Sequence, residues 1–221
     1  MSALSPILRQ SLFIAGTDTG VGKTWVATRL LKALGREGLR AAGMKPVAAG
    51  AELTAHGLRN EDALALQSAA PVCLPYDWVN PCCLPAPTSP HLAARRAGQV
   101  VDTAAIRQAF DRIRAETELI IVESAGGWLA PIADPLAPGR NGPSMQDIAL
   151  TLNLPVLLVV GMRLGCLSHA LLTADAIARA GLPLAGWIAN PIDPGFADQG
   201  DYVESLRLRL PAPLLSIPAD A

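Results

Sequence analysis

The fold of this chain is indicated by residues 11–24, which read SLFIAGTDTGVGKT. Residues 11–15 form a short apolar run that is typical of a buried strand, and glycines follow it at once. A helical pattern of apolar residues begins directly after Thr24 and reaches a plausible stop at Gly38. A strand, a glycine-rich turn and a helix in this order are the setting that a phosphate-binding loop requires.

Residues 16–24 carry the chemistry of such a loop. Glycines allow backbone N–H groups to turn toward an anion, and the start of the helix adds partial positive charge. Lys23 brings an ammonium group to the outer phosphates of a nucleotide, and the Thr24 hydroxyl is placed to ligate Mg²⁺. The strict pattern has glycine five positions before Gly22, where this chain has Thr17. We therefore expect a deviant Walker A loop.

Apolar runs and helical patterns alternate along the rest of the chain. Further strands are expected at residues 39–44, 118–122, 155–161 and 183–189, and further helices at residues 61–69, 103–116, 167–180 and 201–210. Continuous apolar strands separated by helices indicate a parallel sheet covered on both faces. The predicted fold is therefore α/β, a doubly wound, mostly parallel sheet of the P-loop NTPase type, with residues 1–221 as a single domain. Such sheets bind ligands at the carboxyl ends of their strands.

The composition excludes several classes of protein. The formal net charge is −1, so no basic surface is expected for nucleic acid or an anionic membrane. The longest strongly apolar stretch, residues 154–162, is much shorter than the ~20 residues of a membrane-spanning helix. The first residues do not resemble a signal peptide, and the four cysteines lack metal-binding spacing, so reduced thiols and a cytoplasmic location are expected. The proline-rich segments 71–90 and 134–143 are predicted loops, either covers of a site or surface excursions.

Two carboxylates stand where a phosphate loop needs a partner for its metal ion. Glu123 ends an apolar strand, and Asp62 lies in the first turn of a predicted helix. Carboxylates of this kind hold Mg²⁺ beside phosphates, whereas an acidic residue in a first turn also stabilises the helix dipole, so both interpretations of Asp62 stay open. Gly126 and Gly127 follow Glu123, and we favour N–H groups that bind an oxyanion over a plain tight turn.

Lys45 follows the strand predicted at residues 39–44. A lysine at the carboxyl edge of a parallel strand faces the ligand crevice, whereas a surface lysine usually lies on a helix face. The position of Lys45 favours a functional role over a solvated one.

Taken together, these motifs resemble the dethiobiotin synthetase family. The resemblance is carried by GTDTGVGKT (16–24), GMKPV (43–47), GLRNEDALAL (57–66), VNP (79–81), PTSPH (87–91), VESAGGW (122–128), VVGMRLGCLSH (159–169) and AGWIAN (185–190). These stretches occur in the family's order and span the chain from about Leu12 to Pro218. The GKT motif alone is generic to nucleotide-binding folds, but the combination is specific.

The resemblance implies an ATP- and Mg²⁺-dependent ligase that closes the ureido ring of dethiobiotin. The substrates would be 7,8-diaminopelargonic acid, CO₂ and ATP. One amine would capture CO₂ as a carbamate, ATP would phosphorylate it to a carbamic-phosphoric anhydride, and the second amine would displace phosphate. Lys45 and Lys23 would be the catalytic residues, because they would neutralise the carbamate beside the γ-phosphate.

The resemblance also implies which residues bind each ligand. Mg²⁺ would be held by Thr24, Asp62 and Glu123. ATP would be bound by Gly20, Val21, Gly22, Lys23, Thr24, Trp25, Asp62, Glu123, Ser124, Ala125, Gly126, Asn190, Pro191, Pro218, Ala219 and Asp220, with Asn190 at the adenine edge. The diamine would be bound by Ala49, Gly126, Gly127, Gly165, Cys166, Ser168 and Tyr202. The family is homodimeric, so the helix start at Cys166 would meet the substrate carboxylate across the interface, with Tyr202 on the other side.

The chain departs from the family pattern mainly at positions implied to contact the substrate. Ala49 stands where many members have serine, and Ser124 replaces a glycine. Arg163 replaces a lysine and Ser168 an asparagine near the implied carboxylate site. The segment 134–143 is longer than usual. These differences spare the phosphate loop and the implied Mg²⁺ ligands, so they bear on substrate contacts rather than on the class of reaction.

Two other functions were weighed against the ligase. An ATP switch of the partition or septum-positioning type carries a second lysine early in the loop, at the position of Asp18 here, and tends to have a basic or amphipathic surface. A related synthetase of cofactor assembly would carry an appended glutaminase domain, for which 221 residues are too few. The sequence favours the ligase over both.

Overall fold

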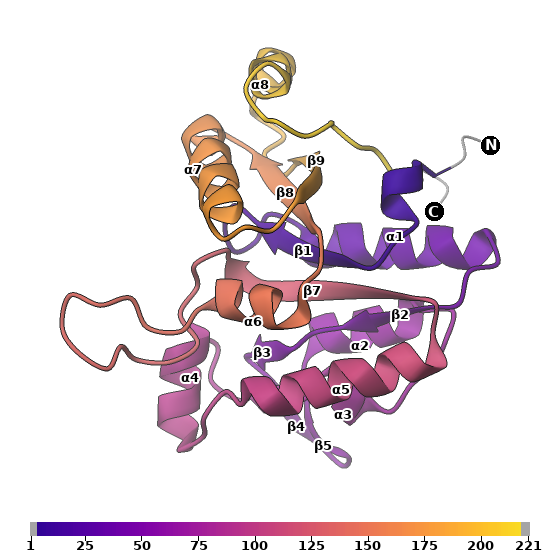
Figure 1. Ribbon diagram of the computed structural model, residues 1–221, viewed down its shortest axis with the longest axis vertical. Coiled ribbons are helices and arrows are strands. Elements are labelled where there is room, and N and C mark those ends of the chain that lie inside the picture. The colour runs from indigo at the N-terminus through magenta and orange to yellow at the C-terminus, as the bar shows by residue number, and fades with distance from the viewer. Residues whose placement is uncertain (1–3, 218–221) are drawn as a thin grey trace.

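The structure, a computed structural model, describes residues 4–217 and centres on a five-stranded sheet (Figure 1). In spatial order the strands are β2 (Ala41–Met44), β7 (Leu119–Gly127), β1 (Leu12–Gly16), β8 (Val156–Met162) and β9 (Leu184–Pro191). All neighbouring pairs in this sheet are parallel. The carboxyl ends of β1, β2 and β7 therefore meet at one edge of the sheet, where a ligand is expected.

Helices cover both faces of the sheet, which confirms the predicted doubly wound fold (Figure 1). One face is covered by α1 (Lys23–Arg36) and α2 (Glu61–Ala69), and the other by α5 (Thr103–Glu116), α6 (Met145–Leu152) and α7 (Cys166–Arg179). A last helix, α8 (Gln199–Arg207), packs against α7. Within residues 4–217 no helix combines the length and apolar character needed to cross a bilayer.

Smaller elements connect β2 to α5. These are β3 (Val47–Ala49), β4 (Glu52–Thr54), β5 (Gly57–Arg59), α3 (Tyr76–Val79), β6 (Cys82–Leu84) and α4 (Pro90–Ala97), and a 3₁₀ turn at Pro6–Leu8 precedes β1. The segment 71–90 was predicted to be a loop, but it contains α3 and β6. Both elements are very short, and β6 exists because β3, far away in sequence, pairs with it in parallel. Such pairing leaves no signal in local periodicity.

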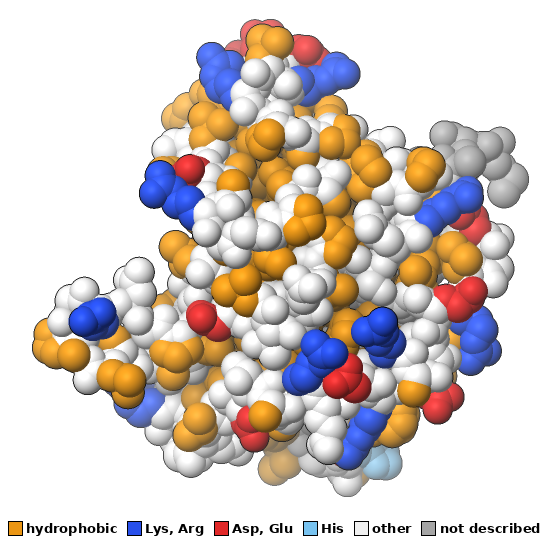
Figure 2. Space-filling view, viewed as in Figure 1, with side chains coloured by type: hydrophobic (Ala, Val, Ile, Leu, Met, Phe, Trp, Pro, Cys, Tyr) orange, Lys and Arg blue, Asp and Glu red, His pale blue; other side chains and the backbone are white. Residues whose placement is uncertain are grey.

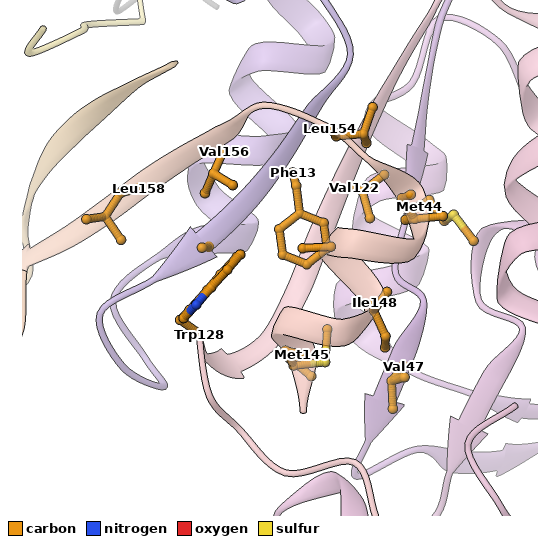
Figure 3. Packing of buried hydrophobic residues seen from close by; sticks show 14 of the residues in the cluster. Phe13, Met44, Val47, Val122, Trp128, Met145, Ile148, Leu154, Val156 and Leu158 are labelled. Atoms are coloured by element: carbon orange, nitrogen blue, oxygen red, sulfur yellow. The ribbon is translucent and has the colours of Figure 1, made fainter. Parts of the chain in front are cut away.

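The core lies on the two faces of the sheet. Along β1, Leu12 and Ile14 pack toward α1, while Phe13 and Ala15 pack toward α5, α6 and α7. Figure 3 shows Phe13 on the second face, where its ring meets the edge of the Trp128 ring at 6.2 Å between centroids. Because both faces of each strand are buried, the strands read as unbroken apolar runs.

Strand β7 is longer than predicted. The sequence places its end just before Glu123, but the strand continues to Gly127. The register between β1 and β7 shifts after the pair Ile14–Glu123, and Gly126 adopts a left-handed conformation with φ of +68°. The irregular end of β7 therefore carries Glu123 and Gly126 past the phosphate loop. The pairing of β7 with β1 that extends the strand was not visible in the sequence pattern.

The surface agrees with the balanced charge of the chain. On the face shown in Figure 2, Lys and Arg side chains are scattered among Asp and Glu side chains and do not form one basic patch. The segment 134–143 projects from the body of the molecule (Figure 1), and Leu136 within it is fully exposed. The prediction that this segment is a loop is confirmed.

Candidate active site

The phosphate loop connects β1 to α1, as the sequence predicts. Gly22 precedes the helix with φ of +88°, a conformation that strongly favours glycine. A Cβ atom at Gly22 would also collide with the side-chain amide of Asn190. The buried Lys23 bends back over the loop, where its Nζ donates to the Asp18 carbonyl oxygen at 2.9 Å. The positive φ of Gly22 and the close approach of the Asn190 side chain thus together fix the conformation of the loop.

Three oxygen ligands converge beside this loop. Thr24 Oγ1 lies 2.9 Å from Asp62 Oδ1 and 2.8 Å from Glu123 Oε1. A hydroxyl has one hydrogen, so it donates to only one of the two carboxylates at a time. The second oxygen of Glu123, Oε2, is buried and has no hydrogen-bond partner among residues 4–217. This excess of hard oxygen acceptors fits Mg²⁺, which prefers carboxylate and hydroxyl oxygens.

No cluster of three or more His, Cys, Asp or Glu side chains with metal-binding geometry occurs in the described part of the chain. A metal ion at the threonine and carboxylate oxygens would therefore need ligands from outside the protein. Mg²⁺ usually binds through one or two carboxylates together with phosphate oxygens and water, so the residues present suit that ion.

The Lys45 ammonium contacts the same two carboxylates as the Thr24 hydroxyl. Its Nζ lies 2.6 Å from Glu123 Oε1 and 2.8 Å from Asp62 Oδ2. Burial pulls the pKa of Lys45 down, but the charges of Glu123 and Asp62 outweigh burial and hold this pKa above its ordinary value. For Asp62, burial raises the pKa, yet the Lys45 charge and hydrogen bonds hold it below its ordinary value. The Lys45 ammonium and the Asp62 carboxylate therefore both stay charged at neutral pH.

The two candidate catalytic lysines act on one region. Burial and, after it, the positive charge of Lys45 together lower the pKa of Lys23 to about 8, against the opposing effect of the nearby carboxylates. Lys45 pairs with the same two carboxylates that contact Thr24, the residue after Lys23, so an anion bound beside Thr24 would be stabilised by both ammonium groups. The arrangement therefore has the charge expected of a site for a phosphate group.

A cleft of about 490 Å³ opens beside Lys45. Its lining includes the predicted site residues Lys45, Ala49, Asp62, Ala125, Gly126 and Gly127, together with Thr19, Asn60, Ala130 and residues 87–90. The structure thus brings several predicted ATP and substrate residues to one cavity. The hydroxyl of Ser124, the residue before Ala125, is buried and has no hydrogen-bond partner in the part of the chain that the structure describes.

The chain was compared with known proteins. A family described as an AAA domain matches residues 10–217. The ATP-dependent dethiobiotin synthetase of Aromatoleum aromaticum is 51% identical over 205 residues, which cover 93% of this chain and 88% of that protein. The corresponding synthetase of Xanthomonas axonopodis pv. citri is 48% identical, over 92% of this chain and 88% of its own length. The chain belongs to the dethiobiotin synthetase family. It is therefore an ATP-dependent ligase of biotin biosynthesis.

Solved structures with low identity support the fold alone. The signal recognition particle 54 kDa protein of Aeropyrum pernix K1, in complex with GDP, is 15% identical with a TM-score of 0.50, over 98% of this chain and 43% of that one. The cell division protein FtsY of Thermotoga maritima is 14% identical with a TM-score of 0.51, over 100% of this chain and 66% of that one. The phosphate-loop architecture predicted from residues 11–24 agrees with both.

The residues that the dethiobiotin synthetase resemblance assigns to the substrate carboxylate lie apart from the cleft lining. Gly165 is the left-handed residue before α7, and Ser168 is exposed on the first turn. Cys166 is buried, and its N–H donates to the Arg163 carbonyl oxygen at 3.1 Å. Arg163 also forms an ion pair of 2.6 Å with Asp18, which joins this turn to the phosphate loop.

The remaining predicted positions are distributed as follows. Tyr202, on α8, packs edge-on against Phe196 at 4.8 Å between ring centroids. Asn190 lies in β9, just before Pro191, and its Nδ2 donates to the Val21 carbonyl oxygen at 2.9 Å, so this nitrogen is already engaged with the phosphate loop. Trp25 is half exposed, with the Arg29 guanidinium 4.7 Å above its ring. Pro218, Ala219 and Asp220 lie outside the described residues.

Sequence reasoning missed three polar residues that support the site, Asn60, Tyr76 and Asn80. Asn60 caps α2, the helix that carries Asp62, through its side chain. Tyr76 and Asn80 are buried and hydrogen-bonded to each other at 3.0 Å. Asn60 and Asn80 stand inside GLRNEDALAL and VNP, two of the stretches that carry the family resemblance. This placement is a sequence signal that points to both residues.

Proposed function

We propose that this protein synthesises dethiobiotin from 7,8-diaminopelargonic acid, CO₂ and ATP, with Mg²⁺ as the metal ion. The observation that carries the proposal is the position of Lys45 between the Asp62 and Glu123 carboxylates, in a cleft beside the phosphate loop. The identity of about one half to named dethiobiotin synthetases supports the choice of substrate.

The phosphate loop and Lys23 would bind the triphosphate of ATP, because loop N–H groups, the start of α1 and the ammonium all favour an anion. Thr24, Asp62 and Glu123 would hold Mg²⁺, which would neutralise charge on the phosphate oxygens when bound. The other residues of 20–25 and 124–126 that the resemblance assigns to ATP lie in or beside this loop. They would therefore contact the nucleotide as well.

The chemistry needs positioning and charge stabilisation but no covalent nucleophile. One amine of the diamine attacks the carbon of CO₂ and loses a proton, which gives a carbamate. A carbamate oxygen then attacks the γ-phosphorus and ADP leaves, after which the second amine attacks the carbamate carbon and phosphate leaves. Lys45 would neutralise the carbamate, and the Gly126 and Gly127 N–H groups would stabilise the developing negative charge.

We further propose that the protein is a homodimer with the substrate carboxylate at the subunit interface. Gly165, Cys166 and Ser168 would receive the carboxylate at the start of α7, with Tyr202 of the partner subunit opposite. The helix start and the exposed Ser168 support this assignment. The four free cysteines are consistent with a cytoplasmic location.

The test is incorporation of isotopically labelled CO₂. Purified protein is supplied with ATP, Mg²⁺, 7,8-diaminopelargonic acid and labelled bicarbonate, and we expect labelled dethiobiotin with one ADP released for each ring closed. Reactions without the diamine serve as controls and are expected to release little ADP. ATP turnover that does not depend on the diamine, with no labelled product, would contradict the proposal and favour an ATP switch.

A further inference from the structure

Two buried polar residues, Tyr76 and Asn80, bond to the backbones of Asn60 and Lys45 and have no part in the proposed reaction. Their exposed fractions are 9% and 3%, and neither contributes to the cleft that contains Lys45. Burial of a polar group is costly unless its hydrogen bonds are satisfied. The partners that satisfy these two residues therefore show what the residues hold together.

The hydrogen bonds form one continuous chain. The Asn60 N–H donates to Tyr76 Oη at 2.8 Å, and Tyr76 Oη donates to Asn80 Oδ1 at 3.0 Å. Asn80 Nδ2 then donates to the carbonyl oxygen of Lys45 at 2.6 Å and to that of Cys82 at 3.2 Å. The chain begins at the residue that caps α2 and ends on the backbone of Lys45.

The Lys45 backbone is held from the same side by a second bond. Its N–H donates to the Val79 carbonyl oxygen at 2.7 Å, so both polar groups of its backbone bond to the segment that ends α3. Lys45 lies just beyond β2, which ends at Met44. The segment around Asn80 therefore replaces the sheet as the support of this lysine.

The chemical identity of each side chain matters. Asn80 presents two hydrogens to two carbonyl oxygens and an oxygen to a hydroxyl, a combination that a carboxylate does not supply. Tyr76 accepts with its oxygen and donates with its single hydrogen. Burial raises the pKa of Tyr76, against the opposing effect of the Asn60 N–H, so the donor stays protonated. The Tyr76 ring is fixed by the Arg59 guanidinium, 4.1 Å above it.

The hydrogen-bond chain ends at the backbones that carry Lys45 and Asp62, whose side chains pair with each other. Asp62 lies in the first turn of α2, after its cap Asn60, and Lys45 follows β2. We propose that Tyr76 and Asn80 are positioning residues that set the separation between the Lys45 ammonium and the Asp62 carboxylate. This inference rests on the proposed function, in which Lys45 neutralises the carbamate. A displacement of about 1 Å at such a contact can reduce a rate about 100-fold.

The test compares Tyr76→Phe and Asn80→Asp with the unaltered protein in dethiobiotin formation. Tyr76→Phe keeps the ring and removes one hydroxyl, whereas Asn80→Asp places a carboxylate against two carbonyl oxygens. We expect kcat to fall at least 10-fold in each variant, with a smaller change in KM for ATP, because the phosphate loop is untouched. The double variant is expected to lose little more than the worse single variant, since both changes break one chain.

A matched control separates positioning from general loss of stability. Phe110→Leu alters a buried side chain of α5, outside the hydrogen-bond chain. It is expected to lower Tm while leaving kcat unchanged. The inference is overturned if Tyr76→Phe and Asn80→Asp keep kcat within twofold of the unaltered protein, or if Phe110→Leu reduces kcat to the same extent at an equal loss of Tm.

A binding measurement separates this inference from the proposed function. The affinity for ADP is measured by calorimetry with and without Mg²⁺. In both variants we expect the increase in ADP affinity that Mg²⁺ produces to be at least threefold smaller than in the unaltered protein. The affinity for ADP without Mg²⁺ should stay unchanged. If the unaltered protein makes no dethiobiotin, the proposed function fails, and the Mg²⁺-dependent gain still decides the inference. The inference is overturned if Mg²⁺ increases the ADP affinity of both variants as much as that of the unaltered protein.

Discussion

At the scale of single residues, Lys45 carries the most specific expectation. Its ammonium contacts both carboxylates at less than 3 Å, whereas Lys23 bonds to the phosphate loop itself. The two lysines therefore have separable roles, although each one influences the charge of the other. Substitution of one should impair the reaction, and substitution of the other should impair nucleotide binding.

Lys45→Ala is expected to lower the rate of dethiobiotin formation by about 100- to 1000-fold, because a charged donor aimed at the reacting group is lost. The dissociation constant of ATP should stay within about threefold, whereas Lys23→Ala should raise it more than about tenfold. Equilibrium binding and product assays check both values. Lys32→Ala, an exposed lysine of α1, is the control. A loss of ATP affinity as large as that of Lys23→Ala would contradict the assignment.

A second expectation at this scale concerns Cys82. Burial raises the pKa of this thiol to about 11, and the neighbouring Cys83 adds to the effect. Only the thiolate reacts with iodoacetamide, so at pH 8 about one molecule in 1000 is reactive at Cys82. The labelling rate should rise about tenfold for each pH unit between 7.5 and 9.5, as peptide mass spectrometry would measure.

The exposed Cys73 provides the comparison for Cys82. It should be labelled much faster at pH 8, and a Cys73→Ser variant removes its signal. A labelling rate of Cys82 that levels off below pH 9 would show that the thiol is more acidic than its partly buried position implies.

At the scale of elements, the phosphate loop depends on Gly22. A side chain at this position meets both a strained φ of +88° and the amide of Asn190. Gly22→Ala should therefore displace the loop or β9 and weaken ATP binding at least about tenfold, a change that corresponds to roughly 1.4 kcal/mol. Calorimetric titration with ATP measures it.

Gly38→Ala is the matched control for this change. Gly38 also has a positive φ, of +78°, but apart from its chain neighbours no atom of the described residues lies within 4 Å of the Cβ position. The control should lose about 1 kcal/mol of stability from backbone strain and keep its affinity for ATP. If both variants lose ATP affinity equally, the contact between Gly22 and Asn190 has no part in binding.

At the scale of the whole molecule, the open question is how the start of α7 takes part in a site centred on the cleft. The ion pair between Arg163 and Asp18 joins this turn to the phosphate loop. The side chain of Cys166 is buried, so the exposed Ser168 is the better position for a test.

Ser168→Glu should raise KM for 7,8-diaminopelargonic acid about tenfold without changing KM for ATP, because a carboxylate at the helix start repels the carboxylate of the substrate. Steady-state kinetics measures the change, and sedimentation of the unaltered protein is expected to show a dimer. Ala178→Glu, on an exposed position late in α7, is the control. An unchanged KM for the diamine would count against the interface assignment.

The sequence by itself determined the parts of this protein whose signal is local. Unbroken apolar runs predicted the five sheet strands, because strands buried on both faces need apolar side chains on both. The glycines, Lys23 and Thr24 predicted a phosphate loop, since backbone conformation and anion binding depend on neighbouring residues. Asp62 and Glu123 were found by residue type and by their place at element ends.

Only the tertiary structure decided how these parts meet. Thr24 reaches Asp62 across 38 residues and Glu123 across 99, and the pairing of β1 with β7 extends the strand that carries Glu123. Tyr76 and Asn80 have no periodic signal, and their partners are set by how α3 packs against the strand ends. Local patterns follow from nearest neighbours and solvent, whereas these contacts depend on the register of distant segments, which a single sequence does not display.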